Sequence, residues 1–181
     1  ALSPVIREQH DEFPMICNAE CKMLVGQFGS YIPGLLREYD EPIEEEDVLI
    51  ISDPYKCGGA ISHINDHLIL LPIFYQGQRI GFSSMFGHLM DVGGPVAGSM
   101  PVTATSIFGE GIRIPPIKLY RRGVENKDVI RLLLNNTRTP IENYSDIQAI
   151  IAGCRVGVRR VINLCERFGL ETYRAATDAL L

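Results

Sequence analysis

The chain has no long apolar run and no excess of positive charge. None of its 181 residues lies in a stretch approaching the roughly 20 apolar residues of a membrane-spanning helix, which argues against a membrane partner. Lys and Arg total 17 against 22 Asp and Glu, for a net charge of −5. Nucleic-acid binding needs a basic face that neutralises phosphates, so the charge argues against a nucleic-acid partner as well.

Cysteines are few, and no secretory signal is visible. The chain has five cysteines, an odd number, and no basic segment followed by an apolar one. We therefore expect reduced thiols and a cytoplasmic protein. Cys17 and Cys21 have the i, i+4 spacing of one helix face, but no second pair completes a zinc site, so we interpret both as core residues. No base can be assigned to Cys57, which favours a packing role there too.

The chain does contain enough apolar sequence for a core. Apolar residues make up 46% of it, and its length suits one domain. It starts without Met and ends on apolar residues of a predicted helix that lacks a cap. We therefore expect residues 1–181 to form a single domain or an internal fragment of a larger subunit.

Apolar runs bounded by turn residues predict several strands. Residues 48–51 form a short buried strand after an acidic loop at 41–47, which we interpret as a solvated connector. Residues 67–75 and 79–86 are two apolar runs separated by Gln-Gly-Gln, the pattern of a β-hairpin. Residues 112–120 contain two consecutive prolines and are expected to be extended.

Helical spacing predicts the first helices of the chain. We expect one helix over about 17–28 and a shorter helical piece after Pro33-Gly34. A further helix begins at an Asn126 cap and runs to about residue 136.

The longest predicted helix spans 146–168, with Ser145 as its cap and Gly169 at its end. Thr172 caps a last helix. The apolar stripe of the long helix would pack on a sheet or a partner; it comprises Ile147, Ile151, Cys154, Val158, Val161, Cys165 and Phe168. The predicted fold class is α+β: a mainly antiparallel sheet that contains a β-hairpin, packed by helices, with a long C-terminal helix.

Two copies of His-x-x-Asp flank the predicted hairpin. One copy runs from His63 to Asp66, and the other from His88 to Asp91. Imidazole and carboxylate groups thus gather at the two outer ends of one local structure. This is where the chain is expected to perform chemistry.

The register of the hairpin has two solutions. If the turn centres on Gly77, Asp66 faces His88 across the strands, where paired Cβ atoms lie roughly 4.5–5.5 Å apart. A two-residue Gln76-Gly77 turn instead pairs Asp66 with Gly87 and puts His88 on the other face of the sheet. The sequence leaves both solutions open.

A metal site explains the residue types. Imidazole and carboxylate together favour Mn²⁺, Fe²⁺ or Zn²⁺, and His63, Asp66 and His88 would leave coordination positions open for catalysis. Asp91 would be a fourth ligand or an acceptor that fixes the His88 ring. The competing interpretation makes each His a hydrogen-bonded residue at a strand end. Iron-oxygenase sites also use two His and a carboxylate, but commonly with His and Asp one residue apart, which disfavours that class.

Three other features lie near these motifs. His67 should face away from Asp66 and act in packing or support. Glu110, between two glycines, is an acid/base candidate, although a lone carboxylate is more often solvated. The Gly- and Pro-rich segment 92–101 could approach a ligand or cover a pocket. It is not a G-x-x-x-x-G-K-[ST] loop, so ATP is expected to bind elsewhere.

Together these motifs resemble the hydantoinase B/oxoprolinase family. The resemblance rests on five segments, in matching order and spacing over about 48–168: Asp53-Pro-Tyr-Lys-Cys-Gly-Gly59, His63-x-x-Asp66, Gly87-His88-x-x-Asp91-x-Gly-Gly94, Gly98-Ser-Met-Pro101 and Phe108-x-Glu-Gly-Ile-Arg-Ile-Pro-Pro116. Within the family, the chain looks most like the alpha-type subunit of acetone and acetophenone carboxylases. Hydantoinase-type members usually carry Gly-Gly-Thr-His-x-x-Asp and a His-His pair; here Ala60-Ile-Ser62 precedes His63, and Gly87 precedes His88.

The resemblance implies a ligand set, a cofactor and partners. It places a metal, with manganese favoured and zinc or iron as alternatives, on His63, Asp66 and His88, and leaves Asp91 in a supporting position. ATP would bind a hydantoinase A-type partner subunit with an actin-like fold, in a complex that can include a small third subunit. The chain would be the metal-containing subunit of an ATP-dependent ketone carboxylase, a ligase that joins a ketone to bicarbonate.

Two other functions stay open. An ATP-dependent hydrolase of hydantoin or 5-oxoproline amides belongs to the same family. A non-catalytic scaffold, in which the helix predicted at 146–168 docks a partner subunit, would need neither metal nor substrate.

Overall fold

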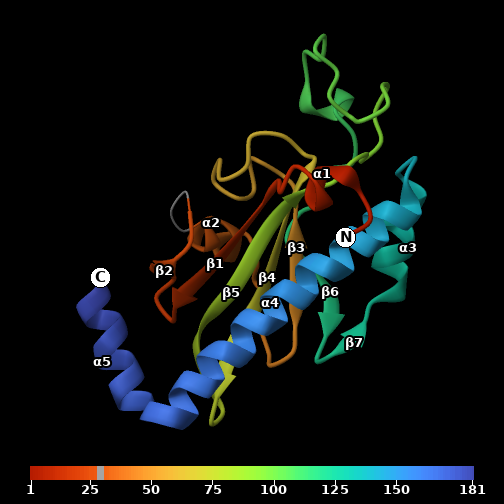
Figure 1. Cartoon of the computed structure of the whole chain (residues 1–181). Helices are drawn as coiled ribbons and strands as arrows, with labels where there is room; N and C mark the ends of the chain where they lie inside the picture. The colour runs from red at the N-terminus through yellow and green to blue at the C-terminus, as the bar shows by residue number, and fades with distance from the viewer. Residues whose placement is uncertain (28–30) are drawn as a thin grey trace.

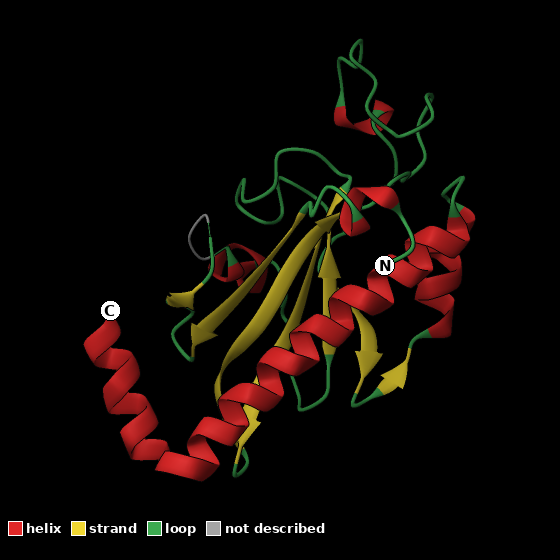
Figure 2. Ribbon diagram, in the orientation of Figure 1, coloured by secondary structure: helices red, strands yellow, loops and turns green. Residues whose placement is uncertain are grey.

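One antiparallel sheet organises the residues that the computed structural model describes, 1–27 and 31–181. Its seven strands follow the order β2-β1-β5-β4-β3-β6-β7, and every neighbouring pair is antiparallel. The strands are β1 (Glu12–Asn18), β2 (Met23–Val25), β3 (Val48–Ile51), β4 (Asp66–Tyr75), β5 (Gln78–His88), β6 (Ile117–Arg121) and β7 (Val124–Glu125). The long β4–β5 hairpin forms the middle of the sheet (Figure 2).

Helices cover the sheet, and the longest one crosses it diagonally (Figure 1). They are α1 (Pro4–Arg7), α2 (Ile32–Arg37), the 3-10 helix η1 (Ile107–Gly109), α3 (Lys127–Asn135), α4 (Pro140–Phe168) and α5 (Leu170–Leu180). The predicted α+β class, with its antiparallel sheet and long C-terminal helix, is confirmed. Among the described residues, no helix combines the length and the apolar character that crossing a membrane requires.

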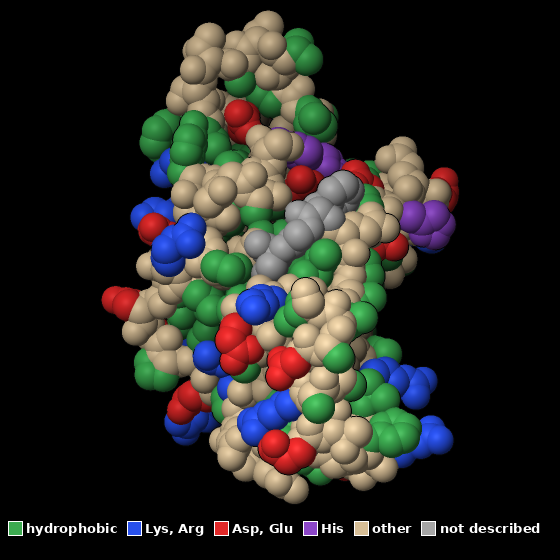
Figure 3. Space-filling view, turned by 90° about the vertical axis from the view of Figure 1, so that its left-hand side faces the viewer, with side chains coloured by type: hydrophobic (Ala, Val, Ile, Leu, Met, Phe, Trp, Pro, Cys, Tyr) green, Lys and Arg blue, Asp and Glu red, His purple; other side chains and the backbone are tan. Residues whose placement is uncertain are grey.

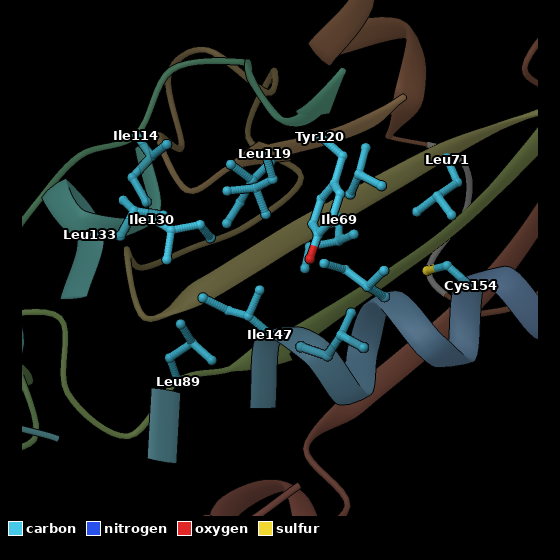
Figure 4. Close-up of a cluster of buried hydrophobic side chains, with 14 of the residues drawn as sticks. Ile69, Leu71, Leu89, Ile114, Leu119, Tyr120, Ile130, Leu133, Ile147 and Cys154 are labelled. Atoms are coloured by element: carbon cyan, nitrogen blue, oxygen red, sulfur yellow. The ribbon is translucent and has the colours of Figure 1, made fainter. Parts of the chain in front are cut away.

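The central strand β4 is buried on both faces. Ile69 and Leu71 pack against α4 in one apolar cluster (Figure 4). Leu68 and Leu70 point the other way, into a second cluster that includes residues of α2. Burying a side chain of this size contributes roughly 1.5–3 kcal/mol. The alternation therefore fixes which face of the sheet each β4 side chain occupies.

The hairpin uses both registers that the sequence leaves open. Its turn is the two-residue Gln76-Gly77 pair, with φ of 51° and 75°, the left-handed conformation that such turns require. A β-bulge then leaves Ile80 as an extra residue of β5. Beyond the bulge the strands follow the other register, which pairs Asp66 with His88. The bulge therefore puts the two residues on one face.

The helix predicted over about 17–28 is wrong. The chain forms β1 and β2 there, joined by a turn in which Cys21 has a φ of 63°. Met15 and Cys17 are both buried, which is the two-residue period of a strand. Position 28 lies outside the described residues. Cys17 and Cys21 are nevertheless core residues as predicted, and none of the five cysteines, all within the described residues, forms a disulfide.

The C-terminal helices begin at other residues than predicted. The cap predicted at Ser145 is wrong, because α4 starts at Pro140; proline suits this first position, where no N–H bond is needed. Gly169 ends α4 as predicted, with a φ of 85°. Thr172 is not a cap, since α5 starts directly after Gly169. The Asn126 cap of α3 is confirmed by the hydrogen bond that its side chain accepts from Val129 N–H.

The acidic loop before β3 is not wholly a solvated connector. Asp47, its last residue, is buried and lies 2.7 Å from Lys118 Nζ. Its carboxylate also accepts hydrogen bonds from the N–H groups of Glu44 and Arg122. The prediction fails here because a buried lysine on β6, distant in sequence, supplies the counter-charge.

Candidate metal centre

His63 and Asp66 are the first and last residues of a tight turn at the start of β4. The Asp66 N–H donates to the His63 carbonyl at 3.3 Å, closing a four-residue turn that folds the two side chains together. His88 ends β5 opposite Asp66. The three-residue spacing of the motif therefore fits a bend, and the hairpin brings in the third residue.

Three candidate ligand atoms form a small triangle. His63 Nε2 lies 3.2 Å from Asp66 Oδ1 and 3.0 Å from His88 Nδ1, and the third side, His88 Nδ1 to Asp66 Oδ1, is 3.3 Å. Ligands bound at about 2.1 Å stand about 3.0 Å apart at right angles and about 3.4 Å apart at tetrahedral angles. The three atoms thus have the spacing of adjacent ligands of one ion. They also form the one group among the described residues with metal-binding composition and spacing.

The charges at the site suit a cation. Burial would raise the pKa of the Asp66 carboxyl, but the hydrogen bonds from His63 and His88 outweigh it and hold the pKa at about 2. The hydrogen bond to Asp66 raises the pKa of His63 above its ordinary 6.5, although burial opposes this. The ionised Asp66 carboxylate beside the two imidazoles therefore supplies the negative charge that a divalent cation needs.

Neighbouring groups orient the rings and leave one side open. Ser62 Oγ lies 3.0 Å from His63 Nδ1, so the other ring nitrogen, Nε2, faces the site. The side chains of His63, His88 and Asp66 are 31%, 13% and 11% exposed. Figure 3 shows histidine surface (purple) bordering acidic side chains (red) in the upper part of the face that it displays. Partial exposure leaves coordination positions for water or substrate.

Asp11 is a carboxylate of the site that sequence reasoning missed. Its Oδ2 lies 3.9 Å from His88 Nδ1, and its carbonyl accepts the His88 N–H at 3.0 Å. It directly precedes β1, which pairs with β5. The only signal that could have found it is this strand pairing, which the incorrectly predicted helix concealed. Asp11 therefore adds a second carboxylate beside the three candidate ligands.

Asp91 contacts the glycine-rich loop that follows β5. Its carboxylate accepts hydrogen bonds from the N–H groups of Gly93, Gly98 and Arg138, at 3.0, 3.0 and 3.1 Å, and from the Arg138 guanidinium at 2.9 Å. Among the described residues, these carboxylate hydrogen bonds all come from residues 93–138 and none comes from His88. Asp91 therefore organises the glycine-rich segment after β5 rather than the His88 ring.

His67 and Glu110, the two further candidates, lie apart from the three candidate ligands and differ in burial. His67 lies on the α4 side of β4, where it lines a small cavity with Leu133 and Ile147. Burial lowers its pKa to about 4, so it is neutral, and its Nδ1 lies 3.0 Å from the Asn65 carbonyl. Glu110 is half-buried in the segment after η1, and its negative charge is among those that raise the pKa of His63.

Gly87 stands directly before His88 and faces the α4 side of the sheet. A Cβ at this position would come within 2.7 Å of Ile150 and 3.1 Å of Ile6. It would also point toward α4, away from the face that carries Asp66 and His88. A side chain at residue 87 would therefore displace the ends of the Ile150 and Ile6 side chains and would not reach the ligand triangle.

The sequence matches the family description hydantoinase B/oxoprolinase over residues 1–181. The chain belongs to this family. It is 38% identical over 155 residues to caprolactamase subunit beta of Pseudomonas jessenii, covering 84% of this chain and 26% of that one. The crystal structure of the ATP-dependent caprolactamase from that organism superposes with a TM-score of 0.86 at 34% identity, covering 94% of this chain and 31% of that one.

Other relatives differ in the activity that their names state. The 5-oxoprolinase 1 of Arabidopsis thaliana is 32% identical over 163 residues, 83% of this chain and 13% of that one. The acetophenone carboxylase delta subunit of Aromatoleum aromaticum is 28% identical over 171 residues, 89% of this chain and 25% of that one. The chain thus spans about a quarter or less of these relatives. The carboxylase branch is represented among them, at lower identity than the caprolactamase.

Proposed function

We propose that this chain supplies the metal centre of an ATP-dependent enzyme that hydrolyses a cyclic amide. The observation that carries the proposal is the triangle of His63, Asp66 and His88 atoms, with sides of 3.0–3.3 Å. The relatives support this reaction class, since the caprolactamase subunit is 38% identical and the acetophenone carboxylase subunit 28%. ATP would bind a partner subunit of hydantoinase A type.

The residues of the site suit this chemistry. His63, Asp66 and His88 would hold a divalent metal, Mn²⁺, Zn²⁺ or Fe²⁺, and such an ion supplies a Lewis acid that polarises a carbonyl oxygen. Asp66 contributes the negative charge, because its carboxylate stays ionised above about pH 2. The Asp11 side chain is 43% exposed beside the ligands. It is therefore the group best placed to accept a proton from an attacking water.

Ketone carboxylation is the second candidate function. One sequence feature favours it: Ala60-Ile-Ser62 separates the glycine pair from His63, unlike the spacing usual in hydantoinase-type members. Under this proposal the same three residues would hold the metal that orients the CO₂ source. The partner with ATP would activate bicarbonate.

Metal content and ATP turnover of the intact complex test both candidates. We expect His63→Ala and Asp66→Ala to lose the bound metal and the substrate-dependent ATP turnover. His10→Ala is the matched control, because His10 is largely exposed and pairs only loosely with Glu12, at 3.8 Å. Metal content equal to that of the unsubstituted protein in both site variants would overturn the proposed site.

The choice of substrate then separates the two reactions. ATP turnover that responds to lactams, without a need for ketone, supports amide hydrolysis. Turnover that requires both a ketone and bicarbonate overturns amide hydrolysis in favour of carboxylation. Metal binding without ATP turnover on either substrate class would contradict both.

A further inference from the structure

Asn65 connects the two segments that carry the candidate ligands. It lies between His63 and Asp66 in the turn and is 0% exposed. Its side-chain Nδ2 donates to the Leu89 carbonyl at 3.0 Å, and its backbone carbonyl accepts a hydrogen bond from the Leu89 N–H at 2.9 Å. Leu89 directly follows His88. Asn65, which directly precedes Asp66, is thus hydrogen-bonded twice to the residue that directly follows His88.

The same side chain also holds the glycine-rich loop. Asn65 Nδ2 donates a second hydrogen bond, at 3.1 Å, to the Gly98 carbonyl. The Gly98 N–H in turn donates to Asp91 Oδ2 at 3.0 Å, and Asp91 lies 2.9 Å from the Arg138 guanidinium. Gly98 is therefore held on one side by Asn65 and on the other by Asp91.

The loop itself is closed by further bonds. Ser99 Oγ donates to the Gly93 carbonyl at 2.6 Å and accepts the Val92 N–H at 2.8 Å. Arg138 also donates to the carbonyls of Gly93 and Val96. Residues 92–99 thus form a single cross-linked loop, and Asn65 is its hydrogen-bonded connection to the turn that holds His63 and Asp66.

We propose that Asn65 is a positioning residue of the metal centre, which fixes the separation of the ligand-bearing segments and couples it to the loop 92–99. The inference rests on the proposed metal site. Its physical basis is that removing the amide leaves the Leu89 and Gly98 carbonyls without this donor. Leu89 adjoins His88, so loss of the hydrogen bond to the Leu89 carbonyl would shift the His88 ring. Outer partners of metal ligands typically contribute about 10–100-fold to metal affinity.

Two replacements of Asn65 test the coupling. Asn65→Leu keeps the approximate volume and removes both donors. It also removes Oδ1, which is buried and has no hydrogen-bond partner among the described residues, so its loss cannot weaken an existing bond. Asn65→Asp keeps the shape but directs an oxygen at the two carbonyls. We expect each variant of the intact protein to bind Mn²⁺ or Zn²⁺ about 10–100-fold more weakly in competition with a chelator.

Matched controls separate positioning from general destabilisation. Asn18→Leu removes another buried asparagine, at the end of β1 beside Gly81, away from the metal centre. Gly98→Ala and Gly77→Ala introduce a side chain at similar φ, 80° and 75°, and neither new Cβ has an atom closer than 4.0 Å. We expect Gly98→Ala to weaken metal binding and Gly77→Ala and Asn18→Leu to leave it unchanged.

A second measurement, hydrogen exchange of the metal-free protein, distinguishes the possible failures. We expect faster exchange in Asn65→Leu at Leu89 and in residues 92–99, and not across β4. Metal affinity and exchange equal to those of the unsubstituted protein would overturn the role of Asn65 while leaving the metal site intact. If the unsubstituted protein takes up no metal, the proposed function fails. Unchanged exchange in the loop would then overturn the connection through Asn65 as well.

Discussion

The two ends of the β4–β5 hairpin are built in different ways. At the turn, two adjacent residues, Gln76 and Gly77, set the local pairing, and the Gly77 Cβ position faces open space. At the opposite end of the hairpin, Asp66 and His88 face each other only because of the bulge at Ile80. There a residue from a distant segment, Asp11, lies beside the candidate ligand His88. The comparison teaches that the turn fixes where the hairpin reverses, whereas the bulge fixes which face the site residues occupy.

Inserting one alanine between Ile80 and Gly81 should have the largest effect on this comparison. With the same one-residue bulge, every later residue of β5 moves one position along β4, which pairs Asp66 with Gly87 instead of His88. His88 would then face α4, and buried side chains of β5 would change face. We expect loss of metal binding together with loss of cooperative unfolding, measured by metal analysis and circular dichroism. A folded insertion variant with unchanged metal affinity would show that the register beyond the bulge does not set the site.

Replacing each aspartate of the two motifs should separate ligand from support. We expect Asp66→Ala to reduce metal affinity beyond the 10–100-fold expected for outer partners, with a smaller change in the stability of the metal-free protein. Asp91→Ala should instead lower the free energy of unfolding by about 2–3 kcal/mol, because several N–H donors lose their acceptor; the exposed part of Arg138 limits the loss. Chelator competition and urea unfolding measure the two effects. Equal profiles for both variants would contradict the assignment.

Metal binding should weaken as pH falls. The raised pKa of His63 means that its pair with Asp66 stabilises the metal-free fold below pH 6.5, and that this contribution is lost as pH rises through the folded-state pKa. Asp66, with its pKa lowered to about 2, contributes above pH 3.8 and loses this on acidification. Metal must displace the His63 proton, so affinity should fall about tenfold per pH unit below that pKa. Thermal unfolding should therefore show a larger metal-induced rise in Tm at pH 8 than at pH 5.5. An equal rise would exclude His63 as a ligand.

The smallest effect should come from the open end of the hairpin. Gly77→Ala places a Cβ on a left-handed residue with free space around it, at a cost of about 1 kcal/mol in the free energy of unfolding. Metal affinity should not change, because the bulge separates the turn from the site. Urea unfolding with a parallel metal titration checks both. A loss of metal affinity would mean that the turn, and not only the bulge, controls the pairing of Asp66 with His88.

Local patterns predicted the hairpin, β3, the Asn126 cap and the end of α4 at Gly169. They also indicated that His63, Asp66 and His88 belong together, although they left the register open, because the bulge at Ile80 leaves no local signal. Asp11 could not be predicted, since the pairing of β1 with β5 brings it to the site. The role of Asp91 depends on Arg138, 47 residues away in sequence. Asp11 and the role of Asp91 were therefore missed because distant segments decide them.

The most direct test of the metal centre is a crystal structure of the intact protein with anomalous data at the absorption edge of the bound metal. We expect one peak bonded to His63 Nε2, Asp66 Oδ1 and His88 Nδ1, at about 2.0–2.2 Å from each atom. A peak bonded to other residues, or metal-loaded crystals without a peak between these three atoms, would contradict the account.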